Sequence, residues 1–164
     1  MLARYNAWAD KVLFEAIVGL PADEAQNGPP PWFKPMLQQL NHIYLVDLIW
    51  QAHLEQRGHG FTRRDIVLHP DLDNLWEAQQ AANDWFVTWA DSQSEPRLDE
   101  EIHFTLTEGN KGVMSRGEIL LHVVNHHTYH RGRISGLFSQ VPCPPPAMDL
   151  PVFRREMPVD MPAL

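Results

Sequence analysis

Four of the nine histidines in this chain of 164 residues fall within nine consecutive positions: His122, His126, His127 and His130. On a helix, side chains four positions apart lie one above the other on the same face. Two imidazoles at that spacing can bind a single metal ion, and the neutral ring is a common ligand of zinc and other first-row metals. The pattern therefore indicates a metal site, with the chemistry of a Lewis acid.

The spacing leaves two pairs open. His122 and His130 are eight residues apart, which is about 12 Å of helical rise, so the two rings cannot share one ion. The pair is therefore either His122 with His126 or His126 with His130. His127 lies nearer the edge of the same face, and His122 and His127 are the candidates for lining the mouth of a pocket. The alternative is a set of histidines that only form hydrogen bonds in the core or at the surface.

A stable site needs at least a third ligand. His42 is the best donor elsewhere, because it lies in a predicted helix that is apolar around much of its circumference. His53, eleven residues further along the same helix, ranks next. His59 and His69 flank a polar linker and His103 lies in a predicted hairpin, so these three are weaker candidates.

Four helical segments must position these side chains. Apolar residues at spacings of three and four predict helices over about residues 2–19, 35–57, 71–89 and 115–139. The clearest start is Ser115 followed by Glu118, a pattern typical of a capping box. Residues 101–106 alternate with period two ahead of a turn at residues 108–112, which predicts a short β-hairpin before the last helix.

The predicted fold class is therefore an all-α four-helix bundle. The linker over residues 58–70 is longer than a tight turn between antiparallel helices needs, which leaves room for a long crossover. Prolines cluster from Pro142 onward, so residues 141–164 are expected to form a Pro-rich tail without regular structure. Residues 1–164 are interpreted as a single domain, since their number suits one hydrophobic core.

Composition argues against several functions. Thirteen basic against 21 acidic residues give a formal net charge of −8, so no nucleic-acid partner is expected. No membrane association is expected either, because no apolar stretch is long enough to span a bilayer and the first six residues lack the apolar core of a signal peptide. The single cysteine, Cys143, excludes an internal disulfide and favours a cytoplasmic location.

Motifs of other enzyme classes are missing. The chain has neither the Gly-x-Ser-x-Gly elbow of serine hydrolases nor the HExxH helix of zinc proteases. A di-iron bundle needs a Glu-x-x-His on each of two helices, and the one such spacing, Glu100 to His103, falls in the predicted hairpin.

Several sequence stretches resemble the DinB/YfiT family, the damage-inducible four-helix metalloproteins rather than the DNA polymerase of that name. Residues 125–132 read NHHTYHRG, which matches the family signature NHxxxHRG. Residues 5–10 (YNAWAD) match its opening segment, and residues 40–43 (LNHI) match the segment that carries its first ligand. Residues 144–150 (PPPAMDL) resemble the family's C-terminal stretch, so the likeness covers nearly the whole chain.

The resemblance implies a four-helix bundle with a long crossover, usually homodimeric. It also implies one divalent ion, typically nickel or zinc, held by three histidines in an open cup. Carried over by position, the ligands are His42, His126 and His130, which makes His122 a neighbour and not a ligand.

Three neutral imidazoles leave such an ion its double positive charge and at least one free coordination position. Related families include transferases and isomerases that use a low-molecular-weight thiol. We therefore expect a metal-dependent enzyme acting on a small molecule, of thiol-dependent S-transferase, isomerase or hydrolase type. A non-catalytic metal-binding or stress-associated protein is the alternative. Asn41 and Asn125 each precede a ligand and are interpreted as capping or packing residues, with hydrogen bonding to the ligands as the alternative. Arg131 is expected to pair with an acid near the helix end and Gly132 to permit a close helix contact. Spacing singles out no second catalytic acid or base.

Overall fold

The computed structural model describes residues 1–20, 31–141 and 143–157. Four long helices form its body: α1 (Leu2–Val18), α2 (Phe33–Leu54), α3 (Leu72–Asp91) and α5 (Arg116–Leu137). The remaining elements are short: α4 (Glu95–Leu98), β1 (Glu101–Thr105), β2 (Lys111–Ser115), the 3₁₀ helix η1 (Phe138–Gln140) and α6 (Leu150–Glu156). The predicted all-α bundle with a hairpin before the last long helix is confirmed. None of the helices in these residues combines the length and the apolar composition that crossing a membrane requires.

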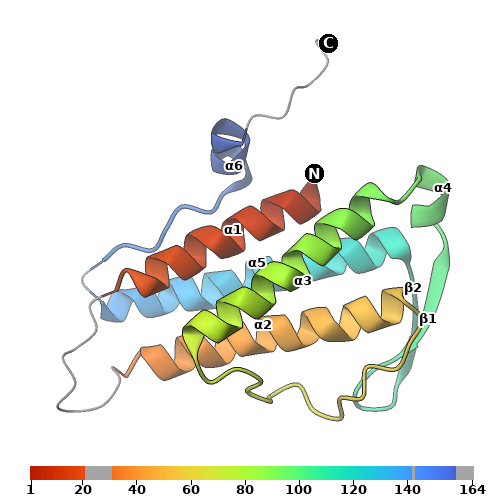
Figure 1. Cartoon of the computed structure of the whole chain (residues 1–164), viewed down its shortest axis with the longest axis horizontal. Coiled ribbons are helices and arrows are strands. Elements are labelled where there is room, and N and C mark those ends of the chain that lie inside the picture. Colours follow the sequence, from red (N-terminus) through yellow and green to blue (C-terminus); the bar gives the residue numbers. More distant parts are fainter. Residues whose placement is uncertain (21–30, 142, 158–164) are drawn as a thin grey trace.

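The order of the helices around the bundle explains the long linker. α1 contacts α3 and α5, and α2 contacts the same two helices. Figure 1 shows α2 and α3 running in one direction while α1 and α5 run in the other. Because α2 and α3 are parallel neighbours, residues 55–71 must return along the length of the bundle. The linker is therefore the predicted crossover, and it passes beside α2.

Capping residues in the sequence set where the helices begin. The Asp71 carboxylate accepts a hydrogen bond from the backbone N–H of Asn74 (2.9 Å), which caps α3. At α5, the Ser115 hydroxyl accepts from the Glu118 N–H (3.2 Å) and the Glu118 carboxylate accepts from the Ser115 N–H (2.7 Å). The predicted capping box is thus confirmed. α2 begins at Phe33, so Pro35 lies in its first turn, where its missing N–H costs nothing.

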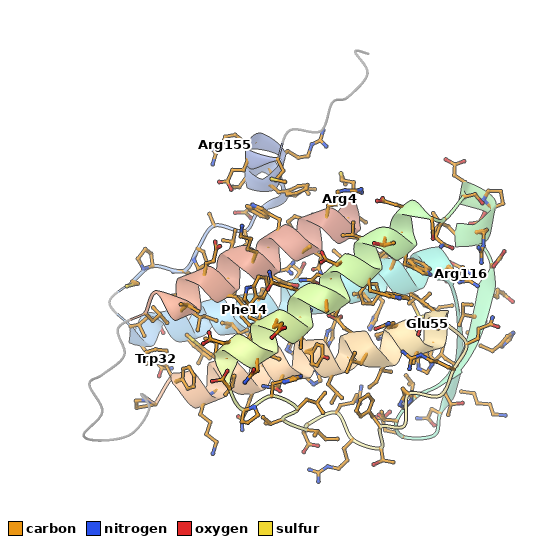
Figure 2. All side chains as sticks on the ribbon, in the orientation of Figure 1. Arg4, Phe14, Trp32, Glu55, Arg116 and Arg155 are labelled. Atoms are coloured by element: carbon orange, nitrogen blue, oxygen red, sulfur yellow. The ribbon has the colours of Figure 1, made fainter. Side chains whose placement is uncertain are left out.

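The hairpin closes one end of the bundle. Its register places Ile102 opposite Met114, and Ile102 is only 1% exposed among apolar residues of α2, α3 and α5. Arg116, at the start of α5, pairs with Glu100 (2.9 Å) and donates to the carbonyl of Leu54 (3.4 Å), which ties this end to α2. Figure 2 shows Arg116 at the same end of the bundle as Glu55, the residue that follows α2.

The prediction of a tail without regular structure is wrong for residues 150–156, which form α6. Phe153 of this helix is 2% exposed, and its ring centroid lies 5.8 Å from that of Tyr5 and 5.6 Å from that of Trp8. Pro151 falls in the first turn, where proline is compatible with a helix. Prolines elsewhere in the tail suggested a broken chain, whereas this one starts a helix. Residues 142 and 158–164 of the predicted tail lie outside the described residues.

Candidate metal centre

Three histidines meet between α2 and α5. His42 comes from α2, His126 and His130 come from α5, and one ring nitrogen of each lies within 4.8 Å of the others. The two Nε2 atoms of His42 and His126 are 3.3 Å apart. In a tetrahedral site with metal–nitrogen bonds of about 2.1 Å, two ligand nitrogens lie about 3.4 Å apart. The cluster therefore fits a single first-row divalent ion.

Hydrogen bonds orient two of these rings. Nδ1 of His42 lies 2.7 Å from the carbonyl oxygen of Arg64, in the crossover linker. Nδ1 of His130 lies 2.7 Å from the side-chain oxygen of Gln39, one turn before His42 on α2. Because both oxygens can only accept, the proton sits on Nδ1 in each ring and the Nε2 lone pair is left for a ligand. Nδ1 of His126 is buried without a partner among the described residues, so no hydrogen bond at this nitrogen orients the third ring.

The environment keeps the α5 rings neutral. Burial, together with repulsion from His130 and the other nearby imidazoles, lowers the pKa of His126 to about 2. Burial and the neighbouring His42 lower the pKa of His130 to about 4. Both rings are therefore uncharged at pH 7, which is the form that binds a metal ion.

The cluster borders solvent on the side of the crossover linker. A cavity of ≈ 350 Å³ is lined by His42 and His130 together with Arg64 and Arg133, and a second of ≈ 580 Å³ also reaches His42. Arg64 forms an ion pair with Glu108 in the hairpin turn, so the linker and the hairpin meet over His42. Small molecules can thus approach His42 and His130 from this side.

His122 lies outside the cluster. Its ring centroid is 6.0 Å from that of His126 and 4.8 Å from that of Trp50, against which it packs. The structure thus brings together the three histidines that the resemblance implied and leaves His122 as a neighbour. The remaining candidates, His53, His59, His69 and His103, also lie outside the three-histidine group.

His127 does not line the pocket mouth, as the sequence suggested. Its side chain is fully buried between two acidic residues, with its ring centroid 6.4 Å from that of His126. Nδ1 lies 3.0 Å from Asp10 of α1, and Nε2 lies 2.7 Å from Asp47 of α2. Burial alone would lower the pKa of His127, but the two carboxylates outweigh burial and raise it to about 9. This histidine is therefore a buried cation at pH 7.

Other polar side chains complete this buried network. Arg131 donates to Asp10 (2.7 Å) and to Asn6 (2.7 Å), as the expectation of an acidic partner requires. Gln79 of α3 donates to Asp47 (2.7 Å). Two carboxylates thus face two cations in the core, and a shift of α1 or α2 along α5 would leave buried polar groups unpaired. The network ties together the helices that carry the histidine cluster.

Two smaller expectations are settled in opposite ways. Asn41, buried next to His42, donates to the carbonyl of His69 (2.9 Å) and accepts from the N–H groups of Leu68 and His69 (2.8 and 2.9 Å). It therefore anchors the end of the crossover to α2, a packing role. Gly132 was expected to allow a close helix contact, but nothing lies within 4 Å of where its Cβ would be, so this expectation is wrong.

The fold and the cluster define a histidine-bearing helical bundle whose second helix and last long helix share one site. The model of the DinB family matches residues 1–160, and the chain belongs to this family. It is similar to Protein DinB of Bacillus subtilis (strain 168), with 29% identity over 149 residues, which cover 85% of this chain and 83% of the relative.

Proposed function

We propose that this protein is a divalent-metal-dependent enzyme that acts on a small molecule. His42, His126 and His130 would hold one ion, nickel or zinc, and the reaction would be of thiol-dependent S-transferase, isomerase or hydrolase type. One observation carries the proposal: three imidazoles converge, and two of them, His42 and His130, line cavities that reach solvent.

A bound divalent ion would supply Lewis-acid chemistry, lowering the pKa of a ligated water or thiol and polarising a carbonyl. The chain's own residues set up that chemistry. Gln39 and the Arg64 carbonyl hold the protons of His130 and His42 on Nδ1, so that Nε2 of each ring can bind. Arg133 is exposed at the wall of the smaller cavity and has no ion-pair partner among the described residues, so it is free to attract an anionic group.

The number of ligands favours an enzyme over a closed structural site. Structural zinc sites are closed by four protein ligands, whereas catalytic sites have three and keep a position open. In the part of the chain that the structure describes, the group contains three histidines and no further acidic residue or cysteine. A non-catalytic metal-binding or stress-associated protein would not need the two cavities that adjoin His42.

The proposal also includes a substrate and an oligomeric state. A low-molecular-weight thiol would serve as substrate, in keeping with the reducing cytoplasm that a single cysteine favours. The family resemblance further favours a homodimer. Sedimentation equilibrium of the purified protein would test that point, with a single species of twice the chain mass as the expected result.

Activity assays on metal-loaded protein test the proposal. Purified chain loaded with nickel or with zinc should consume a thiol in the presence of a small electrophile, or hydrolyse an activated ester or amide. His126→Ala should lose the activity while His122→Ala keeps most of it. A fully loaded protein without turnover across panels of thiols, electrophiles and esters would contradict the enzymatic function and favour the non-catalytic alternative.

A further inference from the structure

A large cavity lies at the hairpin end of the bundle, apart from the histidine cluster. It measures ≈ 990 Å³, which is in the range of small-molecule sites. The C-terminal end of α2, residues 56–62 and the β-hairpin enclose it, at the end of the bundle where Figure 2 labels Glu55. None of the three clustered histidines lines it. Its histidine on α2, His53, is eleven residues from His42, or about 16 Å of helical rise.

His53 has a hydrogen-bonding capacity that the described residues do not satisfy. The residue borders the cavity but is only 7% exposed, and its Nε2 atom is buried without a partner. Burial and the nearby His59 lower the pKa of His53, so the ring is neutral at pH 7 and carries one donor and one acceptor nitrogen. A buried polar atom without a partner is costly, and a ligand that reaches it would remove that cost.

Aromatic rings form much of the cavity wall. The ring of His53 is perpendicular to that of His59 (5.2 Å between centroids) and 5.3 Å from that of Phe104. Phe61 stacks parallel to His59. The Phe104 ring lies over Gly112 so closely that a Cβ there would be 2.5 Å from it, so this wall is tightly fitted. Such walls favour a flat, unsaturated ligand over an aliphatic one.

The charges around the cavity favour an anion. Lys111 and Arg57 line it against a single acidic residue, Glu101, in a chain whose net charge is −8. Lys111 is exposed and has no ion-pair partner in the described ranges, while Arg57 shares its charge with Glu55 (2.5 Å). With Glu55 and Glu101 counted, the formal charges at the rim balance, and Lys111 is the cation there that remains free to attract an anion.

From these observations we infer that the cavity binds a small aromatic carboxylate. The ring of the ligand packs against Phe61 and Phe104, and the carboxylate accepts a hydrogen bond from Nε2 of His53 and attracts Lys111. The site is separate from the metal cup, with which it shares only the flanking segments of the linker and hairpin.

Access to His53 requires a small local movement. Its Nε2 atom is screened from solvent, so residues around it must move as the ligand enters, and residues 56–62 border the cavity beside it. Nothing lies within 4 Å of the Cβ positions of Gly58 and Gly60, so this segment has open space into which it can move. Once reached, the buried nitrogen forms a hydrogen bond away from competing water, where such bonds are strong.

Titration of the full-length protein with 2-naphthoate and benzoate, followed by nuclear magnetic resonance of the histidine rings, tests the inference. We expect saturable binding in the millimolar range or tighter and a shift of the His53 ring resonances. 2-Naphthylmethanol, which lacks the charge, and cyclohexanecarboxylate, which lacks the aromatic ring, should bind more weakly. Binding should persist in metal-free His126→Ala protein, which separates this site from the proposed metal function.

Variants locate the site. His53→Phe keeps an aromatic ring at this position but has no ring nitrogens, and it should weaken 2-naphthoate binding by about tenfold. Lys111→Glu, an exposed change that leaves the core intact, should weaken it by about threefold or more. His69→Gln, which replaces a histidine outside the cavity, should leave it unchanged.

The inference would be overturned by no saturable binding of either carboxylate, by binding that both His53→Phe and Lys111→Glu leave intact, or by equal affinity for the neutral alcohol. Binding that disappears with the metal would place the carboxylate at the histidine cluster and would equally overturn it. Since Lys111→Glu does not touch the core, the test stands even if His53→Phe fails to fold.

Discussion

His126 and His127 are neighbours in the sequence and on the same helix, yet their surroundings give them opposite properties. His126 is surrounded by other imidazoles, and its pKa is lowered to about 2. His127 lies between Asp10 and Asp47, and its pKa is raised to about 9. Burial acts on both rings in the same direction, so the difference comes from the partners. Crowded imidazoles stay neutral and suit a metal, whereas a histidine between carboxylates becomes a structural cation.

The two regions depend on one another through the helices they share. His127 contacts Asp10 of α1 and Asp47 of α2. Because α2 also carries His42 and α5 also carries His126, contacts that hold α2 against α5 set the distance between those two histidines. We therefore expect changes in the buried network to affect stability first and metal affinity second.

The largest effect is expected from breaking the network. Asp47→Ala leaves His127 and Gln79 without their acceptor and should lower the free energy of unfolding by about 3–5 kcal/mol. Denaturant unfolding monitored by circular dichroism would measure it. Asp84→Ala, an exposed change on α3, is the control and should stay within about 0.5 kcal/mol of wild type. A loss below about 1 kcal/mol for Asp47→Ala would show that the network contributes little.

The charge of His127 predicts a dependence of stability on pH. Its pKa is raised in the folded state, so its stabilising contribution is fully present below about pH 6.5, its ordinary pKa, and is lost as the pH rises toward about 9. Unfolding free energies of wild type and His127→Gln, measured across this range, should therefore converge as the pH rises. A difference that stays constant or grows would mean that His127 is neutral when folded.

The metal affinity of the histidine cluster should depend on the groups that orient its rings. Gln39→Leu removes the acceptor for Nδ1 of His130 and should weaken zinc or nickel binding by about tenfold while leaving stability nearly unchanged. Competition with a chromophoric chelator would measure the affinity. Gln38→Leu is a matched control, because Gln38 lines the same cavity but forms no hydrogen bond with a clustered histidine. Equal affinity in both variants would argue against an orienting role for Gln39.

The smallest effect is expected from the helix cap of α5, whose loss should lower stability without changing either histidine environment. Ser115→Ala removes the hydroxyl of the capping box at the start of α5 and should cost about 1 kcal/mol of stability. Since the cap is seven residues before His122 and further from the cluster, metal affinity should not change. A loss of metal binding in this variant would show that the site responds to the general stability of α5.

The sequence predicted features that repeat or that have a local cause. The spacing of four between His126 and His130, the apolar helix around His42 and the capping box at Ser115 are all visible in one chain segment at a time. Local patterns of this kind, together with the period-two alternation of residues 101–106, were enough to predict the four long helices and the hairpin. The choice between the two possible histidine pairs was not local, and it needed the family resemblance.

Features that depend on how helices face one another were missed. The sequence places His127 near the edge of a face, but it does not show that Asp10 and Asp47 come from two other helices to meet it. Gln39 of α2 was missed for the same reason, since spacing does not show that it meets His130 of α5. The Arg64 carbonyl was missed because the irregular crossover has no periodicity from which its path could be inferred. The acidic residues on predicted helix faces that are otherwise apolar were the signal that could have revealed the network.

The metal content of purified protein tests the central claim most directly. Elemental analysis of wild type, His126→Ala and His122→Ala, each with its helical content checked by circular dichroism, would compare His126, which belongs to both pairs that the spacing allowed, with His122, which belongs to only one of them. We predict one divalent ion per chain in wild type and in His122→Ala, and none in a folded His126→Ala. Equal metal content in wild type and His126→Ala would contradict the assignment of His42, His126 and His130 as the metal ligands.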